Sequence, residues 1–141
     1  MSPVAFGRMG AGDREEAFGL FLAFLRADPH YRDVAAVYGD AGPEALGRAL
    51  DLFLQRPETG FVWVGRREGE VVGCCVVCLA ISTSRGTLVA KLDDVNVRPG
   101  LEGQGIGSAM LDSLKAELKR SGVTRIDTAT HVDNPGARRF Y

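Results

Sequence analysis

The sequence predicts an α/β fold of the α+β type, in which helices flank a mixed, mostly antiparallel central sheet. Three strand-like stretches between positions 61 and 97 are joined by turns too short for a crossover, so neighbouring strands must run antiparallel. A helical stretch then leads to one more strand, and such a crossover makes its two flanking strands parallel. With 141 residues the chain fits a single domain, 1–141, with the order β-α-α-β-β-β-α-β-α.

The first half of the chain predicts one strand and two helices. Val4–Met9 is a short strand. Asp13 begins a helix, and Glu16 three residues later completes a pair of the capping-box type. Apolar residues recur at helical spacing until Pro29 ends this helix. A second helix occupies 43–57, a stretch bounded by prolines that suit its first turn and its end.

The pattern then changes to the period of strands. Phe61–Arg67 alternates, a Glu-Gly turn follows, and Val71–Ser82 returns as the second strand of a hairpin. Thr87–Val97 forms a third strand. After a glycine-rich loop, Ile106–Ser121 carries leucines and a methionine at helical spacing. A further strand over Arg125–His131 precedes a helical turn that opens at Asn134-Pro135.

Composition excludes several classes of protein. The net charge of −1 gives no basic field that would attract nucleic acid or anionic lipid. The longest apolar run is too short to cross a bilayer, and no basic segment with an apolar stretch follows the first Met, so we expect a cytoplasmic protein. Cys74, Cys75 and Cys78 lie on one predicted strand. Residues three apart on a strand face opposite ways, which predicts core cysteines and no metal site.

The loop with Gly103, Gly105 and Gly107 is the most informative motif. It lies where a strand passes into a helix, so backbone N–H groups and the helix dipole can converge on a phosphate. A flexible turn without a ligand is the alternative. A P-loop is excluded because no Lys lies between Lys91 and Lys115. A Rossmann-like nucleotide-dependent oxidoreductase is the second alternative, although that fold places its glycines in the first βαβ unit.

The stretch LDDVNVRPGLEGQGIGSAMLDSLKAELKRSGVTRIDTATHVDNPGARRFY resembles the central motifs of the GNAT superfamily of N-acetyltransferases. It has a strand ending in V-x-P, a loop with paired glycines at Gly105 and Gly107, a helix, a strand, and the pattern N-x-x-A-x-x-F-Y. The resemblance implies a GNAT-like acyl-CoA N-acyltransferase fold. It implies transfer of the acetyl group of acetyl-coenzyme A to a primary amine by direct attack in a ternary complex.

The resemblance also implies the site residues. The cofactor-binding set comprises backbone positions on the third strand of the meander, the loop and helix start, and one Asn: Val95, Asn96, Val97, Gly103, Gln104, Gly105, Ile106, Gly107, Ser108 and Asn134. Tyr141 falls on the family's acid for the leaving thiolate. Asn134 is equally natural as a helix cap, and Tyr141 as a buried aromatic. Glu102 departs from the Arg or Gln usual there, and we expect Arg98 or Gln104 to supply a compensating donor.

An ammonium substrate must lose a proton before it attacks, and a carboxylate is a reasonable base. Asp93 and Asp94 are the candidates, and strand alternation predicts that they face opposite ways, so that one at most meets the acceptor. We favour Asp93, with His131 as an alternative. The segment 28–40 is acidic and aromatic, which suits a cationic amine and equally suits an ordinary exposed loop. The acceptor is therefore a small-molecule or peptide amine.

Two further expectations concern completeness. The GNAT pattern continues beyond its Tyr, so we expect that the chain lacks its C-terminal strand or strands, or that a second subunit covers the open edge as a homodimer.

A third class of function also stays open, namely a non-catalytic acyl-coenzyme A-binding protein. Tight coenzyme A binding without turnover would distinguish that class from an enzyme.

Overall fold

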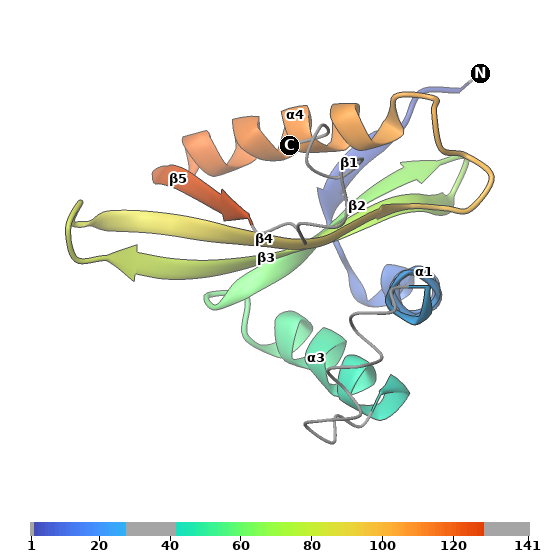
Figure 1. Ribbon diagram of the computed structural model, residues 1–141, viewed down its shortest axis with the longest axis horizontal. Helices are drawn as coiled ribbons and strands as arrows, with labels where there is room; N and C mark the ends of the chain where they lie inside the picture. Colours follow the sequence, from blue (N-terminus) through green and yellow to red (C-terminus); the bar gives the residue numbers. More distant parts are fainter. Residues whose placement is uncertain (1, 28–41, 129–141) are drawn as a thin grey trace.

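The computed structural model describes residues 2–27 and 42–128, which form a sheet with helices on both faces (Figure 1). Alternating apolar positions produce the strands and apolar positions at helical spacing produce the helices, as the sequence predicts. In chain order the elements are β1 (Ala5–Arg8), a 3₁₀ turn (Ala11–Asp13), α1 (Arg14–Arg26), α3 (Pro43–Gln55), β2 (Gly60–Arg67), β3 (Glu70–Ser82), β4 (Thr87–Val97), α4 (Ile106–Arg120) and β5 (Val123–Thr128).

The five strands of the described residues lie in the order β1-β2-β3-β4-β5. The pairs β1–β2, β2–β3 and β3–β4 are antiparallel, and β4–β5 is parallel. The mixed, mostly antiparallel sheet predicted from the sequence is therefore confirmed. The parallel ladder reaches only from Leu88↔Val123 to Leu92↔Thr128, whereas β4 continues to Val97.

Two apolar clusters hold the layers together. On one face α4 packs through Met110 and Leu114 against β2, β3 and β4. On the other face α1 and α3 pack through Phe21 and Leu50. Cys74 and its neighbour Cys75 each have 0% of their surface exposed, but the first belongs to the α1–α3 cluster and the second to the α4 cluster. β3 is thus buried on both faces, which explains its nearly continuous apolar sequence.

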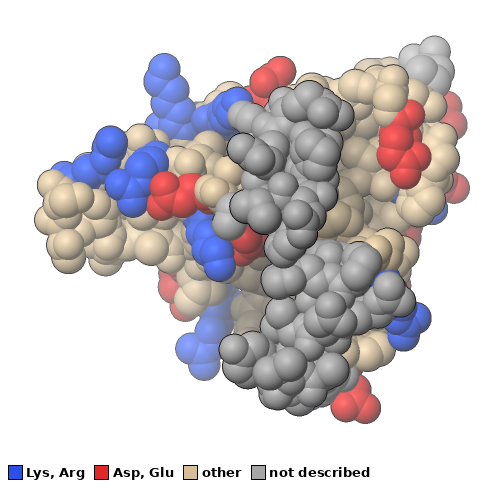
Figure 2. Space-filling view, viewed as in Figure 1, with Lys and Arg blue, Asp and Glu red and all other residues tan. Residues whose placement is uncertain are grey.

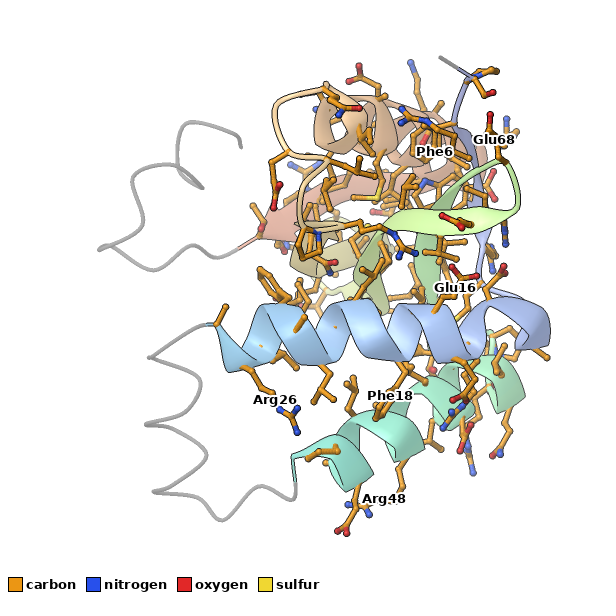
Figure 3. The ribbon with its side chains drawn as sticks, turned by 90° about the vertical axis from the view of Figure 1, so that its right-hand side faces the viewer. Phe6, Glu16, Phe18, Arg26, Arg48 and Glu68 are labelled. Atoms are coloured by element: carbon orange, nitrogen blue, oxygen red, sulfur yellow. The ribbon has the colours of Figure 1, made fainter. Side chains whose placement is uncertain are left out.

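The capping pair expected at the start of the first helix is wrong. No side-chain cap hydrogen bond forms at Asp13; its carboxylate accepts the Gly10 N–H at 2.8 Å and pairs with Arg66. The hydrogen bonds from Arg66 lower the pKa of Asp13. Glu16 points from α1 to the sheet while Phe18 points to α3 (Figure 3). These carboxylates attach α1 to the sheet, a long-range role that local spacing does not reveal.

Element boundaries agree with the sequence to within a few residues. The helix expected to end at Pro29 ends at Arg26. The strand expected over Arg125–His131 begins at Val123 and is described to Thr128, and the helical turn expected at Asn134 lies outside the described residues. Within 2–27 and 42–128, no helix has the length and apolar character needed to cross a membrane.

The nearly equal numbers of acidic and basic residues in the sequence are also visible on the surface of the molecule. On the face shown in Figure 2, basic side chains gather at the left end with acidic side chains between them. Lys115, Lys119 and Arg125 line a shallow pocket between the end of α4 and β5. Among the residues that the structure describes, no group of three or more His, Cys, Asp or Glu side chains is arranged to hold a metal ion.

We predict that Gly60→Ala destabilises the fold. Gly60 has φ +155°, and a Cβ there would lie 2.2 Å from the backbone oxygen of Val77. The clash should lower the free energy of unfolding by about 3 kcal/mol in urea titrations. Gly19→Ala is the matched control, because its Cβ meets nothing within 4 Å on α1. That change should raise stability by about 0.5–1 kcal/mol. Equal stability of the two variants would contradict this packing.

Candidate active site

The loop between β4 and α4 has the geometry of an anion cradle. Gly103 and Gly105 have φ +81° and +80°, the left-handed region that favours glycine. A Cβ at either position would meet nothing within 4 Å, so each would project into open space beside the loop. Ile106, the first residue of α4, is only 4% exposed, and its burial fixes where the helix begins. A bulky anion can therefore approach the backbone at the start of α4.

The polar side chains near this loop differ in part from the expectation. Arg98 is not turned to the loop: its guanidinium donates to the Val71 oxygen at 3.0 Å and pairs with Glu16 at 3.1 Å. The expectation that Arg98 compensates for Glu102 is therefore wrong, because the residue is used to attach α1 and β3 to β4. Glu102 accepts the Gly100 N–H at 2.8 Å, so its carboxylate is held by its own turn.

A basic residue that sequence reasoning missed lies beside the loop. The turn between β2 and β3 comes close to the β4–α4 loop (Figure 1). Arg67, at the end of β2, donates to the Gln104 carboxamide oxygen at 3.5 Å. The first turn of α4 includes Gly107 and Ser108, and Gln104 lies just before the helix. The side chains of Gln104 and Ser108 are exposed. Arg67 is far away in sequence from the motif, and only the hairpin geometry brings it there.

β4 is irregular directly before the loop. Val76 pairs with Asp93 and Cys74 with Asn96, so two residues of β4 oppose one of β3, which is a β-bulge. Asp94 has φ +57°, an uncommon conformation for a residue other than glycine that Asp tolerates better than most. Strained conformations of this kind gather at functional sites. The bulge therefore marks this part of β4 as a candidate site on grounds independent of the loop.

The Asn96 side chain links β3 and β4 at the bulge. Its Nδ2 donates to the backbone oxygen of Asp94 at 2.9 Å and to the backbone oxygen of Cys74 at 3.4 Å. Asn96 is 9% exposed and lies on the α1–α3 face with Cys74, so its carboxamide is part of the fold. Val95 packs against the α4 cluster on the opposite face. Val97 ends β4 at the entrance to the loop.

The bulge interrupts the alternation expected along this part of β4. Asp93 is paired with Val76, which packs on the α1–α3 cluster, so Asp93 lies on that face. Since Asn96 lies there as well, the bulge removes the regular alternation between Asp93 and Asn96. Burial raises the pKa of both Cys74 and Cys78, and the charge of Asp94 raises it further. That Asp93 and Asp94 face opposite ways stays a prediction, and both carboxylates remain candidates.

Three neighbouring side chains define the α1–α3 side of β4. Lys91 Nζ lies 3.3 Å from Asp93 Oδ2, and the partner of Lys91 across the ladder is Cys78. Asp93 is 31% exposed and Lys91 64% exposed, so the pair is open to solvent. The carboxylate thus already receives a primary ammonium. Lys91 is a second residue that the sequence analysis did not select, and its i, i+2 spacing from Asp93 is the signal that could have found it.

The cysteines do not act as nucleophiles in this arrangement. Burial raises the pKa of Cys74 to about 12 and raises the pKa of Cys75 further, so both stay protonated thiols. Burial also raises the pKa of the half-buried Cys78. The expectation of core cysteines is confirmed for Cys74 and Cys75, and Cys78 lies at the edge of the core.

β4 continues beyond its last described pairing with β5. The described ladder runs to Leu92↔Thr128, and Thr128 is the last residue of β5 that the structure describes (Figure 1). Within the described residues, Asp93–Val97 is paired with β3 only. This stretch, which holds the bulge, leads directly into the glycine loop. Asn134, Tyr141 and His131, expected at this site from the sequence, lie outside the described residues, as does the whole acidic segment 28–40.

Three examples illustrate which known proteins the chain is similar to. It is 28% identical over 75 residues to aminoalkylphosphonate N-acetyltransferase of Salmonella typhimurium, covering 53% of this chain and 49% of that protein. It is 33% identical over 95 residues to IAA acetyltransferase of Azospirillum brasilense, covering 67% and 59%. The chain thus spans about half the length of these curated relatives. A crystal structure of a transcriptional regulator from Bacillus halodurans has the same fold, with a TM-score of 0.78, 24% identity, and coverage of 99% and 89%.

Residues 28–141 also match the acetyltransferase (GNAT) family, a range that contains the bulge of β4, the glycine loop and all of α4. The resemblance read from the sequence is therefore confirmed: the chain belongs to the GNAT family of acetyltransferases.

Proposed function

We propose that the protein is an N-acetyltransferase that moves the acetyl group of acetyl-coenzyme A to a primary amine by direct attack in a ternary complex. Family membership together with the glycine cradle directly after the bulge of β4 carries the proposal. Acetyl-coenzyme A supplies the activated thioester. The residues of this chain bind the pyrophosphate, orient the acetyl group and remove the proton of the amine.

The pyrophosphate is assigned to Gly103–Ser108. The left-handed glycines leave room on the open side of the loop, and the first turn of α4 adds the positive end of its dipole. Arg67 adds a positive charge from the neighbouring hairpin, which offsets Glu102 in the loop. The pantetheine arm is assigned to the space between β4 and β5 beyond the last described pair, Leu92↔Thr128, because the family resemblance implies that the two strands separate there.

The acetyl carbonyl is assigned to the bulge. As the amine attacks, negative charge develops on the carbonyl oxygen, and a backbone N–H within Val95–Val97 stabilises it. Asn96 holds the bulge in shape through its contacts with Asp94 and Cys74. A donor held rigidly in this way needs no reorganisation when the charge forms. Tyr141 and Asn134 keep the roles that the family resemblance gives them, as the acid for the thiolate and as a cofactor contact.

Asp93 is the proposed base. Its carboxylate lies one residue before the bulge on the α1–α3 face, and its contact with Lys91 is the contact that a substrate ammonium would make. Asp94 is the second candidate. The acceptor is proposed to be a small-molecule or peptide amine, and the protein a cytoplasmic homodimer. A screen of acetyl-coenzyme A turnover across amine classes, combined with sedimentation, tests these points.

The other classes are less well supported. A Rossmann-like oxidoreductase needs its glycine loop within a largely parallel sheet, whereas β4 is parallel to β5 and antiparallel to β3. An acyl-coenzyme A-binding protein without catalysis would use the same loop. Turnover of any amine in the screen decides between that class and an enzyme.

We predict that Gly105→Val weakens coenzyme A binding. A valine would fill the space beside the loop and strain a φ of +80°. We expect a loss of tenfold or more in calorimetric affinity, about 1.4 kcal/mol per factor of ten. Gly86→Val is the matched control: it has φ +69° and similarly open surroundings, but lies at the opposite end of β4. Backbone strain alone would affect both variants. Wild-type affinity in Gly105→Val would contradict the assignment.

We predict that replacement of the base changes the pH dependence of the rate. Asp93→Asn should lower the rate by about 10²–10⁴-fold. The loss should be largest below the pKa of the amine, where the substrate carries the extra proton, while coenzyme A affinity is retained. Asp94→Asn tests the second candidate in the same way. Asp112→Asn, an exposed carboxylate on α4, is the control. Unchanged pH–rate profiles in both strand variants would exclude these carboxylates from the mechanism.

We predict that Asn96→Ala loosens the bulge. The change leaves the Asp94 and Cys74 oxygens without their side-chain donor, and a lost buried contact of this kind costs about 1–3 kcal/mol. Amide exchange at Asp94 and Val95 should accelerate in NMR. Ser82→Ala removes another buried polar side chain, near the far end of the β3–β4 hairpin, and should leave those amides unchanged. Equal protection in both variants would remove Asn96 from the support of the bulge.

A further inference from the structure

One amine of the chain itself lies beside the proposed base. Lys91 Nζ is 3.3 Å from Asp93 Oδ2, and the two residues lie on one face of β4. Because Lys91 precedes Asp93 and its ammonium reaches that carboxylate, the side chain extends along the strand toward the bulge. The last described pair of the β4–β5 ladder is Leu92↔Thr128, and Leu92 lies between these two residues. Lys91 therefore stands at the place to which we assign the acceptor amine.

The ion pair does not fix Lys91 in place. Its side chain is 64% exposed, and an ion pair this open to solvent contributes little to stability. The ammonium can leave the carboxylate and return at small cost. The distance from Lys91 to the bulge is three residues, roughly 10 Å of extended strand. The four-carbon stem of lysine covers a large part of that distance.

We propose that Lys91 is an acetylation site of this chain, modified by the chain's own acetyl-transfer site. The proposal rests on the proposed function and deepens it, because it identifies the acceptor chemistry as a primary alkylamine of the lysine type. The observation behind it is the contact between Lys91 Nζ and the proposed base, Asp93, directly before the bulge of β4.

The reaction balances with acetyl-coenzyme A as the only co-reactant. The Lys91 ammonium gives one proton to Asp93, and its free Nζ attacks the carbonyl carbon. A bond between Nζ and that carbon forms, and the bond between the carbon and sulfur breaks. The nitrogen then gives up its second proton, which the departing thiolate takes up directly or through water. The products are a neutral N-acetyl-lysine, the free thiol of coenzyme A and the proton on Asp93, which passes to water.

The product would alter the site in a defined way. An acetylated Lys91 has no charge to pair with Asp93, so the carboxylate becomes open to an external ammonium. Acetylation of Lys91 would thus leave Asp93 available to bind the ammonium group of later substrates.

The test uses the purified full chain with acetyl-coenzyme A and no added amine. The sequence contains three lysines, Lys91, Lys115 and Lys119, so peptide mapping reads every lysine in one experiment. Lys115 and Lys119 are exposed on α4 and report the uncatalysed background. We expect Lys91 to gain an acetyl group at least tenfold faster than either, and to lose that advantage in the urea-unfolded chain.

Two variants distinguish catalysed acetylation of Lys91 from background acetylation that depends only on solvent exposure. Asp93→Asn should slow the labelling of Lys91 by about 100-fold and leave Lys115 and Lys119 unchanged, because only Lys91 depends on that carboxylate. Lys91→Arg keeps a positive charge beside Asp93 but has no lysine amine, so its intact mass should show only the background. Labelling of Lys91 at the rate of Lys115 and Lys119, or equal labelling in Asp93→Asn, would overturn the proposal.

A binding measurement distinguishes this failure from failure of the proposed function. If calorimetry shows coenzyme A bound to the wild type and Lys91→Arg alike while Lys91 stays unmodified, the inference about Lys91 is wrong and the proposed function stands. If coenzyme A does not bind to either protein, both proposals fall. Excess coenzyme A should also suppress labelling of Lys91 and not of Lys119, since only the former requires the bound thioester.

Discussion

The carboxamide of Asn96 bridges the two backbone oxygens on either side of the irregularity in β4, and the geometry of the site follows from that contact. β4 pairs with β3 on both sides of the bulge, where β4 holds one residue more than β3. The extra residue bends the strand locally. β4 then leads into the loop from which α4 starts. The candidate base, the bulge and the cradle are therefore parts of one backbone path.

A second set of polar contacts joins the layers around this path. Glu16 on α1 accepts the Val71 N–H at 3.0 Å and pairs with Arg98 at the end of β4. Arg66 on β2 pairs with Asp13 in the same way at the start of α1. Each pair is only partly exposed, so its geometry is more restricted than that of a surface ion pair. They set the position of α1 over the ends of β3 and β4, on the face where Asp93 lies.

Periodicity in the sequence was sufficient to predict the helices, the meander and the parallel crossover, because these follow from contacts local in the chain. The glycine loop could be predicted for the same reason: its residues are consecutive. The bulge could not, since it depends on how β4 meets Cys74 and Val76 about twenty residues away. The strand alternation from which the orientations of Asp93 and Asp94 were predicted is interrupted at this bulge. Arg98 was expected to act at the glycine loop, but it forms its contact with Glu16, which lies 82 positions away in the sequence.

The indole of Trp63 gives the molecule a built-in optical reporter. It is the chain's only tryptophan, it is 5% exposed, and its Nε1 donates to the Ser113 hydroxyl on α4 at 3.0 Å. Detachment of α4 from the sheet would break this contact and let water reach the ring, which shifts indole emission to longer wavelengths. Fluorescence from a single, unmodified residue can thus follow the helix that begins at the glycine loop, and so reveal whether that helix separates before the rest of the sheet unfolds.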